Sequence, residues 1–229
     1  MLKTTGLTLH YGGSQILHVI DIEARQGEVT CIMGTNGVGK TSLLKALAGT
    51  HLRSGGTVTC NGKDLGRVPP QVMARNGLAY VPQGRMIFPL LSVRENLETG
   101  FALLPKSEHR VPEEIYDLFP MLKDMGSRRG GDLSGGQQQQ LAIARAMITR
   151  PKVMLMDEPT EGIQPSIIQQ IGRVITYLKQ RGDMAIVLVE QYLDFAYDLG
   201  DQFYVLQRGA VVASGRKTEM TKDALRQGL

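Results

Sequence analysis

A glycine-rich stretch near the start of the chain has the residue types and spacing of a phosphate-binding loop. GTNGVGKT, residues 34–41, fits the pattern G-x-x-x-x-G-K-[ST] and lies between a strand-like run and a helix-like run. Glycines let a backbone wrap closely around phosphates, a lysine can reach the outer phosphates, and a hydroxyl can bind Mg²⁺. The predicted contacts are Gly34, Thr35, Asn36, Gly37, Val38, Gly39, Lys40, Thr41 and Ser42, of which Thr41 also binds the metal.

Such a loop needs an acidic partner on a neighbouring strand. VMLMDEP supplies one, since four apolar residues are followed by Asp157 and Glu158. Asp157, at the end of the predicted strand, is the expected Mg²⁺ ligand. Adjacent side chains on a strand point in different directions. We therefore assign Glu158 a separate catalytic role, which is to orient or deprotonate the attacking water.

A second stretch, LSGGQQQQLAIARA at 133–146, also suits an anion. Ser134, Gly135 and Gly136 stand where a loop becomes a helix. A helix start offers free backbone N–H groups and the positive end of the helix dipole. One chain with two phosphate-binding features raises the question of whose phosphate the second one binds.

The predicted elements that carry these stretches indicate an α/β fold. The first third reads as short strands, at 7–11, 16–22, 28–34, 57–60 and 78–82, and Asn61-Gly62 marks a hairpin. Helices are predicted near 92–104, from Pro112 and from Ser134 to Ile148, with Pro120 bending or shortening the second. The last third alternates: a strand at 153–157, a helix at 165–182, a strand at 184–189, a helix at 191–199 and a hairpin at 202–215. Such alternation implies a parallel sheet covered on both faces, interrupted by a helical insert.

Composition narrows the class of protein. The 229 residues are 42% hydrophobic and 21% charged, as in an ordinary globular protein. The net charge of +4 is scattered, which favours a solvated surface over a nucleic-acid site. No apolar run approaches the ~20 residues that span a bilayer, and the start has no signal-peptide core. Cys31 and Cys60 lack CxxC spacing, so we expect buried free thiols in a reducing, cytoplasmic compartment.

GTNGVGKT, VPQG, LSGGQ, MDEPT and MAIVLVE occur in the order found in ABC-type ATP-binding subunits, and the chain resembles that family along essentially its whole length. The resemblance implies an ATP hydrolase with ATP and Mg²⁺ as cofactors. It implies a P-loop NTPase fold of the ABC type, with a mixed sheet core, an N-terminal antiparallel β subdomain and an inserted α-helical subdomain. The single domain would be 1–229, with 1–85 and 151–229 as the nucleotide-binding core and 86–150 as the helical subdomain that carries the signature motif.

The resemblance also implies roles for individual residues. In a head-to-tail dimer, Ser134, Gly135, Gly136 and Gln137 would cap the ATP held by the other subunit. Tyr11 matches the aromatic residue that stacks on adenine, although by itself it reads as a strand-end residue. Gln83 matches the glutamine that senses Mg²⁺ and the γ-phosphate and signals to the transmembrane subunit. The following stretch, 84–97, would face that subunit.

Two positions depart from the family pattern. Gln191 stands where these ATPases usually carry a switch histidine, and none of the four histidines follows Asp157. Gln191 can hydrogen-bond a phosphate oxygen but cannot carry positive charge. Gln164 replaces the usual aspartate three residues after Glu161. We therefore expect an asymmetric heterodimer with a second ATP-binding subunit that carries the full switch; a homodimer remains open for the isolated chain.

With a glutamine at the switch position, the chain resembles the second ATPase of urea and branched-chain amino-acid importers. The segments LSGGQQQQLAIARA, DEPTEGIQPSII and RGDMAIVLVEQYLDFA look most like the urea type. The implied partners are two transmembrane permease subunits and, indirectly, an extracytoplasmic solute-binding protein, with the chain peripheral on the cytoplasmic face of the inner membrane. A branched-chain amino-acid importer is the alternative. A soluble ABC ATPase acting on nucleic acid or ribosomes and a P-loop kinase fit less well, since the chain has no paired P-loops or basic inserts and a kinase would leave LSGGQ idle. No nucleic-acid partner is expected.

Overall fold

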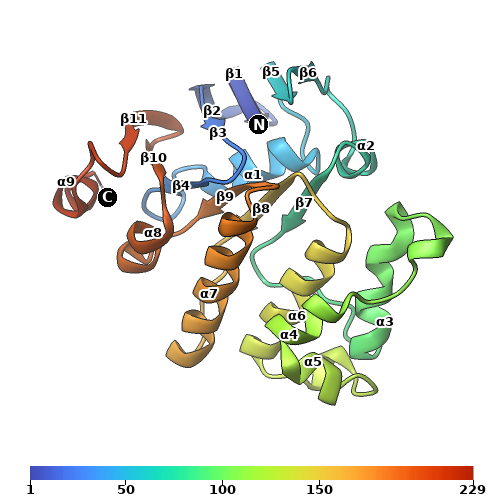
Figure 1. Cartoon of the computed structure of the whole chain (residues 1–229). Coiled ribbons are helices and arrows are strands. Elements are labelled where there is room, and N and C mark those ends of the chain that lie inside the picture. The colour runs from blue at the N-terminus through green and yellow to red at the C-terminus, as the bar shows by residue number, and fades with distance from the viewer. Residues whose placement is uncertain (229) are drawn as a thin grey trace.

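Two β-sheets enclose helix α1 (Lys40–Ala48) in the computed structural model, which describes residues 1–228 (Figure 1). The smaller sheet is antiparallel, has the order β2-β1-β5-β6, and β3 pairs with β1. Its strands are β1 (Leu2–Tyr11), β2 (Ser14–Ile20), β3 (Glu23–Ala24), β5 (Gly55–Cys60) and β6 (Lys63–Asp64). β1 begins earlier than the predicted 7–11 because Leu2 and Thr4 are buried alternately with exposed residues and pair with β5.

The larger sheet has six strands in the order β11-β10-β4-β9-β8-β7. These are β4 (Val29–Met33), β7 (Leu78–Val81), β8 (Val153–Asp157), β9 (Ala185–Val189), β10 (Gln202–Gln207) and β11 (Ala210–Arg216). The strands from β10 to β7 are parallel, and β11 is antiparallel to β10. The carboxyl ends of β4, β7 and β8 therefore share one edge, which is where open α/β sheets bind ligands.

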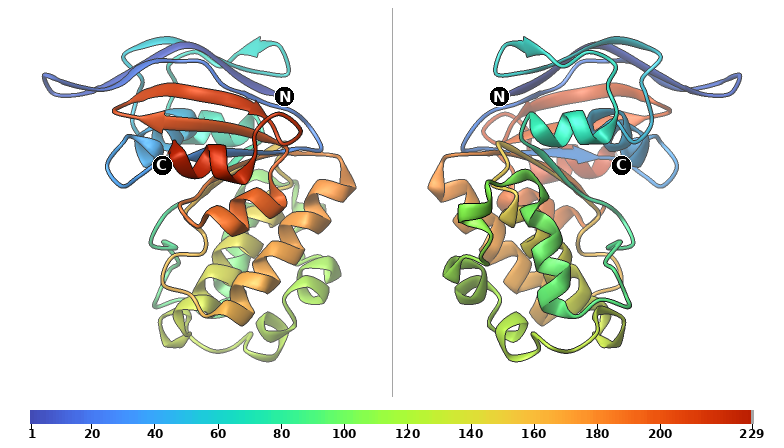
Figure 2. Two further views of the ribbon diagram at one scale, coloured as in Figure 1. Left: turned by 90° about the vertical axis from the view of Figure 1, so that its left-hand side faces the viewer. Right: turned by 90° about the vertical axis from the view of Figure 1, so that its right-hand side faces the viewer.

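Helices on the other side of the large sheet form the second layer, and α3, α4 and α5 lie at the end of the molecule away from the N-terminal strands (Figure 2). The helices besides α1 are α2 (Pro70–Arg75), α3 (Val93–Glu98), α4 (Glu113–Leu118), α5 (Pro120–Asp124), α6 (Gly135–Ile148), α7 (Pro165–Arg181), α8 (Leu193–Leu199) and α9 (Lys222–Gln227). Short 3₁₀ turns occur at Thr99–Leu103, Lys106–Glu108 and Gly130–Asp132.

Local signals set several boundaries as predicted. Ser92 and Ser134 each close a capping box at the start of α3 and α6, and Gly182 ends α7 with φ of 71°. The helix predicted from Pro112 is divided at Phe119, because Pro120 lacks an N–H and disfavours helical geometry in the residue before it.

The hydrophobic core lies on both faces of the large sheet. One cluster joins α1 and the antiparallel sheet to this sheet, and the other joins it to α6, α7 and α8. Cys31 and Cys60 are buried free thiols, as predicted. Within residues 1–228, the helices are all too short or too polar to traverse a bilayer.

Candidate functional site

The glycine-rich loop follows β4 and leads into α1, which is the strand–loop–helix arrangement that the sequence predicts. Gly34 has φ of 155°, and a Cβ there would lie 2.5 Å from the Leu206 carbonyl oxygen, so only glycine fits. Lys40 is the first residue of α1 and its side chain is buried. Its ammonium donates to the carbonyl oxygens of Gly34, at 2.7 Å, and Thr35, at 2.9 Å. These two bonds hold the ammonium inside the curve of the loop.

Asp157 and Glu158 lie next to this loop, at the carboxyl end of β8. The Thr41 hydroxyl donates to Asp157 Oδ1 at 3.1 Å. Glu158 follows the strand with φ of 47°, and its Oε1 lies 3.3 Å from Lys40 Nζ. The two carboxylates have different partners because the backbone bends after β8, and not because side chains alternate along a strand: Asp157 contacts the Thr41 hydroxyl, while Glu158 contacts Lys40. A hydroxyl beside a carboxylate is a pair of oxygen ligands of the kind that Mg²⁺ prefers, so the residues fit a magnesium ion.

Desolvation dominates the electrostatics of Asp157. Burial raises the pKa of its carboxyl, and hydrogen bonds from Tyr80 and Thr41 act in the opposite direction. Only 1% of Asp157 is exposed. The two donors stabilise an ionised carboxylate that would otherwise be costly at this depth. A bound cation would add to that stabilisation.

A pocket of about 300 Å³ opens over these groups. Its lining combines residues from the first hairpin, the loop, α1 and the segment after β7: Tyr11, Ile16, Asn36, Gly37, Gly39, Lys40, Thr41, Ser42, Gln83 and Glu158. Tyr11 lies at the rim of the pocket and packs against His51, with ring centroids 4.3 Å apart. It is 40% exposed, so part of its ring remains accessible to a ligand. The structure thus brings Tyr11, the loop, Gln83 and Glu158 together around one cavity.

Gln83 connects this pocket to the loop after β8. Its amide nitrogen donates to Glu161 Oε2 at 2.9 Å and lies 3.5 Å from Glu158 Oε2. A single side chain therefore contacts two carboxylates, one of which also pairs with Lys40.

The second predicted anion-binding feature lies apart from this pocket. Ser134 is exposed and caps α6, and its backbone N–H donates to Gln137 Oε1 at 2.9 Å. Ser134, Gly135, Gly136 and Gln137 are absent from the pocket lining. Arg85 packs against this helix start, since a Cβ on Gly135 would lie 2.8 Å from Arg85 Nη1. The two phosphate-binding features do not meet within one chain.

The substituted positions Gln191 and Gln164 are both exposed. Gln164 begins α7 without a side-chain cap bond. Gln191 follows β9, and its backbone N–H donates to Glu190 Oε2 at 3.0 Å. Gln191 is absent from the pocket lining as well.

Two further residues, which the sequence did not single out, organise the site. Tyr80 donates its hydroxyl to Asp157 Oδ2 at 3.0 Å. Glu190 is 2% exposed and accepts from the Thr160 N–H and hydroxyl and from the N–H groups of Gln191 and Tyr192. Glu190 therefore joins the loop after β8 to the loop after β9. A buried acid at the end of an apolar strand was the available signal.

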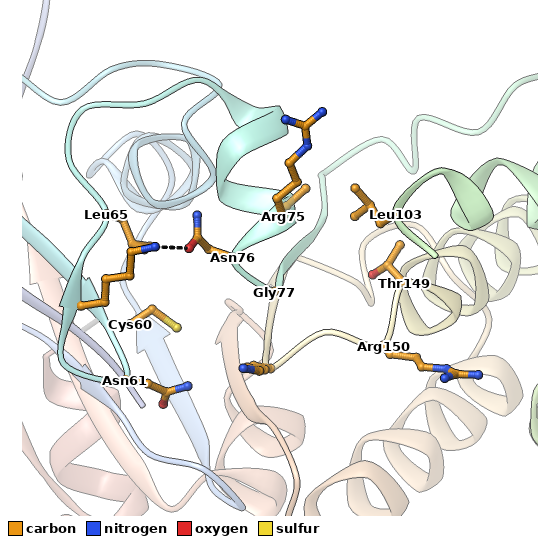
Figure 3. Close-up of a pocket in the computed structure, with 12 residues that line it drawn as sticks. Cys60, Asn61, Leu65, Arg75, Asn76, Gly77, Leu103, Thr149 and Arg150 are labelled. Carbon is orange, nitrogen blue, oxygen red and sulfur yellow. Dashed lines mark hydrogen bonds between the residues drawn. The ribbon is translucent and has the colours of Figure 1, made fainter. Parts of the chain in front are cut away.

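A larger cavity, of about 460 Å³, lies elsewhere. Gly77 and Lys152, which precede β7 and β8, line it, so it occupies the edge opposite to the loop. Asn76 accepts a hydrogen bond from Lys63, and the side chains of Arg75 and Arg150 point in different directions (Figure 3). Arg150 is paired with Glu108. These groups do not converge on a common point, so the smaller pocket is the candidate site.

Comparisons with known proteins agree with this geometry. A family model described as "ABC transporter" matches residues 17–161. The chain is 39% identical to the high-affinity branched-chain amino acid transport ATP-binding protein BraG of Pseudomonas aeruginosa, covering 93% of this chain and 91% of BraG. It is 34% identical to the probable branched-chain amino acid transport ATP-binding protein LivF of Archaeoglobus fulgidus, over 96% and 94% of the two chains.

Among solved structures, a nucleotide-free ATP-binding cassette from an ABC transporter superposes with a TM-score of 0.87 at 27% identity, covering 99% of this chain and 95% of that one. The predicted fold is therefore confirmed. BraG and LivF are named for branched-chain amino-acid transport, and they give no support to the urea type expected from the resemblance.

Proposed function

We propose, from the premise that this chain belongs to the ABC transporter family and carries its ATPase domain, that it binds Mg-ATP and hydrolyses it to power an importer of branched-chain amino acids. Lys40, Thr41 and Glu158 line one pocket, and Asp157 is hydrogen-bonded to Thr41 beside it; this arrangement carries the hydrolytic part of the proposal. The solute class is supported by the similarity to BraG and LivF. It cannot be argued from the pocket, because the groups there would contact nucleotide and not the transported solute.

The chain's own groups divide the chemistry between them. Lys40 would exchange its two carbonyl contacts and Glu158 for the β- and γ-phosphates. Thr41 and Asp157 would hold Mg²⁺, which neutralises charge on the phosphates when it is bound. Glu158, once released from Lys40, would orient or deprotonate the attacking water. Gln83, in contact with Glu158 and Glu161, would sense the metal and the γ-phosphate, and Tyr11 would stack on the adenine.

The signature residues Ser134 to Gln137 would act on the ATP of a second subunit. They lie outside the pocket of their own chain, and α6 presents an exposed N-terminus. A site divided between two subunits closes only when ATP is present, so closure becomes a mechanical signal that hydrolysis ends. Gln191 and Gln164 favour a heterodimer in which the other ATP-binding subunit carries the full switch.

Exposed apolar side chains after Gln83 support a permease partner. Met86, Phe88 and Leu90 are 66%, 49% and 80% exposed and follow one another closely in the chain. Such a group suits a protein interface better than water. Two transmembrane subunits docked there would place the chain on the cytoplasmic face of the membrane, with a solute-binding protein on the other side.

The solute assignment is tested by deleting the gene in its host and measuring uptake of micromolar labelled leucine and labelled urea. Loss of leucine uptake alone is the expected result. Loss of urea uptake alone would restore the urea importer that the motifs suggest while leaving the ATPase mechanism intact. If both uptakes persist, the branched-chain amino-acid and urea assignments are both wrong, and the membrane partner must be identified before another solute is tested. Reintroducing the wild-type gene and the Lys40→Ala variant separates loss of ATP use from loss of the protein.

A further inference from the structure

Tyr80 forms a contact that the proposed chemistry leaves unexplained. It lies in β7, the edge strand of the large sheet, and pairs with Leu155 of β8. Asp157 is two residues beyond Leu155, so both side chains are on the same face of the sheet. A tyrosine is long enough to span this diagonal, and its hydroxyl reaches Asp157 Oδ2 at 3.0 Å.

The carboxylate of Asp157 is consequently held at both oxygens. Tyr80 donates to Oδ2, and Thr41 donates to Oδ1 at 3.1 Å. The terminal torsion of an aspartate is soft, so one donor alone would let the carboxylate rotate about its end. The two donors come from different elements, β7 and α1, and together they fix the plane of the group. Each oxygen keeps a second lone pair for a further ligand.

The Tyr80 phenol is the donor in this contact. A phenol has one hydrogen to donate, whereas an ionised carboxylate can only accept. The phenol hydrogen therefore points at Asp157 Oδ2. The contact is polar, half-buried and short, unlike the apolar packing of Leu78 on the same face.

We propose that Tyr80 is a positioning residue for the magnesium site, holding the Asp157 carboxylate so that Oδ1 stays beside the Thr41 hydroxyl. This inference rests on the proposed Mg-ATP site. Mg²⁺ demands a near-ideal octahedron, whereas Ca²⁺ accepts varied geometries. Loss of the phenol therefore weakens Mg²⁺-dependent nucleotide binding far more than Ca²⁺-dependent binding. A merely structural phenol would show no such preference between metals.

The test compares the wild-type chain with Tyr80→Phe and the matched control Tyr204→Phe. Tyr204, in β10 of the same sheet, accepts a hydrogen bond from the Glu23 N–H at 3.0 Å, so the control also removes one phenol contact. A non-hydrolysable fluorescent ATP analogue is titrated into the full-length chain, followed by anisotropy, with excess Mg²⁺, with excess Ca²⁺ and with EDTA. Thermal melting of each variant reports folding.

For Tyr80→Phe we expect the Mg²⁺-dependent affinity to fall about tenfold, the equivalent of one hydrogen bond to a charged group. Ca²⁺-dependent affinity should change less than about twofold on the same reasoning, and affinity in EDTA should not change. Tyr204→Phe should match wild type in all three titrations.

Three results would overturn the role of Tyr80: unchanged Mg²⁺-dependent affinity, an equal loss with Mg²⁺, Ca²⁺ and EDTA, or the same loss in Tyr204→Phe. A wild-type chain that binds the analogue equally with Mg²⁺ and with EDTA overturns the magnesium site itself, and the role of Tyr80 with it. A wild-type chain that binds no analogue at all contradicts the proposed function. The first group of results leaves that function standing.

Discussion

Lys40 and Glu158 form a buried ion pair across the pocket, with Nζ and Oε1 3.3 Å apart and both side chains at most 6% exposed. The same ammonium donates to the carbonyl oxygens of Gly34 and Thr35. In this arrangement the loop lysine and the proposed catalytic carboxylate neutralise each other. We expect bound ATP to displace Glu158 from Lys40, which would free the Glu158 carboxylate for its proposed action on water.

Glu158→Gln should abolish turnover while strengthening the ATP-bound state. Removal of a general base costs on the order of a hundredfold or more in rate, and the amide no longer competes with phosphate for Lys40. We expect the variant to form an ATP-dependent dimer on size-exclusion chromatography and to lose ATPase activity. Glu161→Gln is the matched control, since Glu161 contacts Gln83 but not Lys40. Wild-type turnover in Glu158→Gln would remove Glu158 from its role.

Leu90→Ser should weaken association with the permease and leave nucleotide binding intact. Leu90 is 80% exposed, so its replacement costs the isolated chain little stability, while a buried leucine at an interface contributes about 2 kcal/mol. Co-purification with the transmembrane subunits measures the first effect, and analogue binding measures the second. Val212→Ser, at a 53% exposed position on β11, is the control. Equal co-purification of both variants would move the docking surface away from this segment.

The sequence was sufficient where contacts are local. The loop from Gly34 to Thr41, the cap at Ser134 and the end of α7 at Gly182 all depend on a few consecutive residues, and each was found at its predicted place. The division of the helix at Phe119 follows from Pro120, but whether a proline bends a helix or ends it depends on the packing around it.

Contacts between distant strands were not predictable in the same way. The Tyr80–Asp157 bond requires that β7 and β8 be neighbours in a particular register, which no local pattern specifies. The four bonds accepted by Glu190 require the loops after β8 and β9 to meet. The separation of Ser134 from Lys40 also depends on the fold, and before the fold was known it was implied only by the family resemblance.

Glu190 should make the chain less stable as pH rises from mildly acidic values. Burial raises the pKa of its carboxyl in the folded chain above the value of about 4.3 expected when unfolded. Below the unfolded pKa both states hold the proton, so the contribution to stability is complete there. Between the unfolded and the folded pKa, the native state binds the proton and the unfolded state does not, so the free energy of unfolding falls as pH rises. Once the pH has passed the folded pKa, the contribution of Glu190 is lost.

Glu190→Gln removes this pH dependence but also replaces one acceptor oxygen by an amide nitrogen. That nitrogen cannot accept from the N–H groups it would face, so we expect a loss of about 2–3 kcal/mol at neutral pH. Guanidinium unfolding followed by circular dichroism between pH 4 and 8 measures both effects, relative to the exposed Glu98→Gln control. A variant as stable as wild type, with the same pH profile, would show that Glu190 does not bear on stability.

Gln191→His should increase hydrolysis at this chain's own pocket if Gln191 limits it. Gln191 is exposed, and its hydrogen bond to Glu190 is made by the backbone N–H, so a histidine side chain fits without disturbing the loop. An imidazole can donate to a phosphate oxygen and carry charge, and about 1.4 kcal/mol of added stabilisation would raise turnover tenfold. Turnover is measured in the complex whose second ATP-binding subunit has lost its P-loop lysine, which isolates the pocket of this chain. Gln191→Asn, which keeps an amide, controls for the substitution itself.

The asymmetry on which this prediction rests has its own test in the wild-type complex, where Lys40 and the P-loop lysine of the second subunit are mutated separately. Comparable ATPase loss in the two variants would contradict the asymmetry, because a slow pocket contributes little turnover to lose.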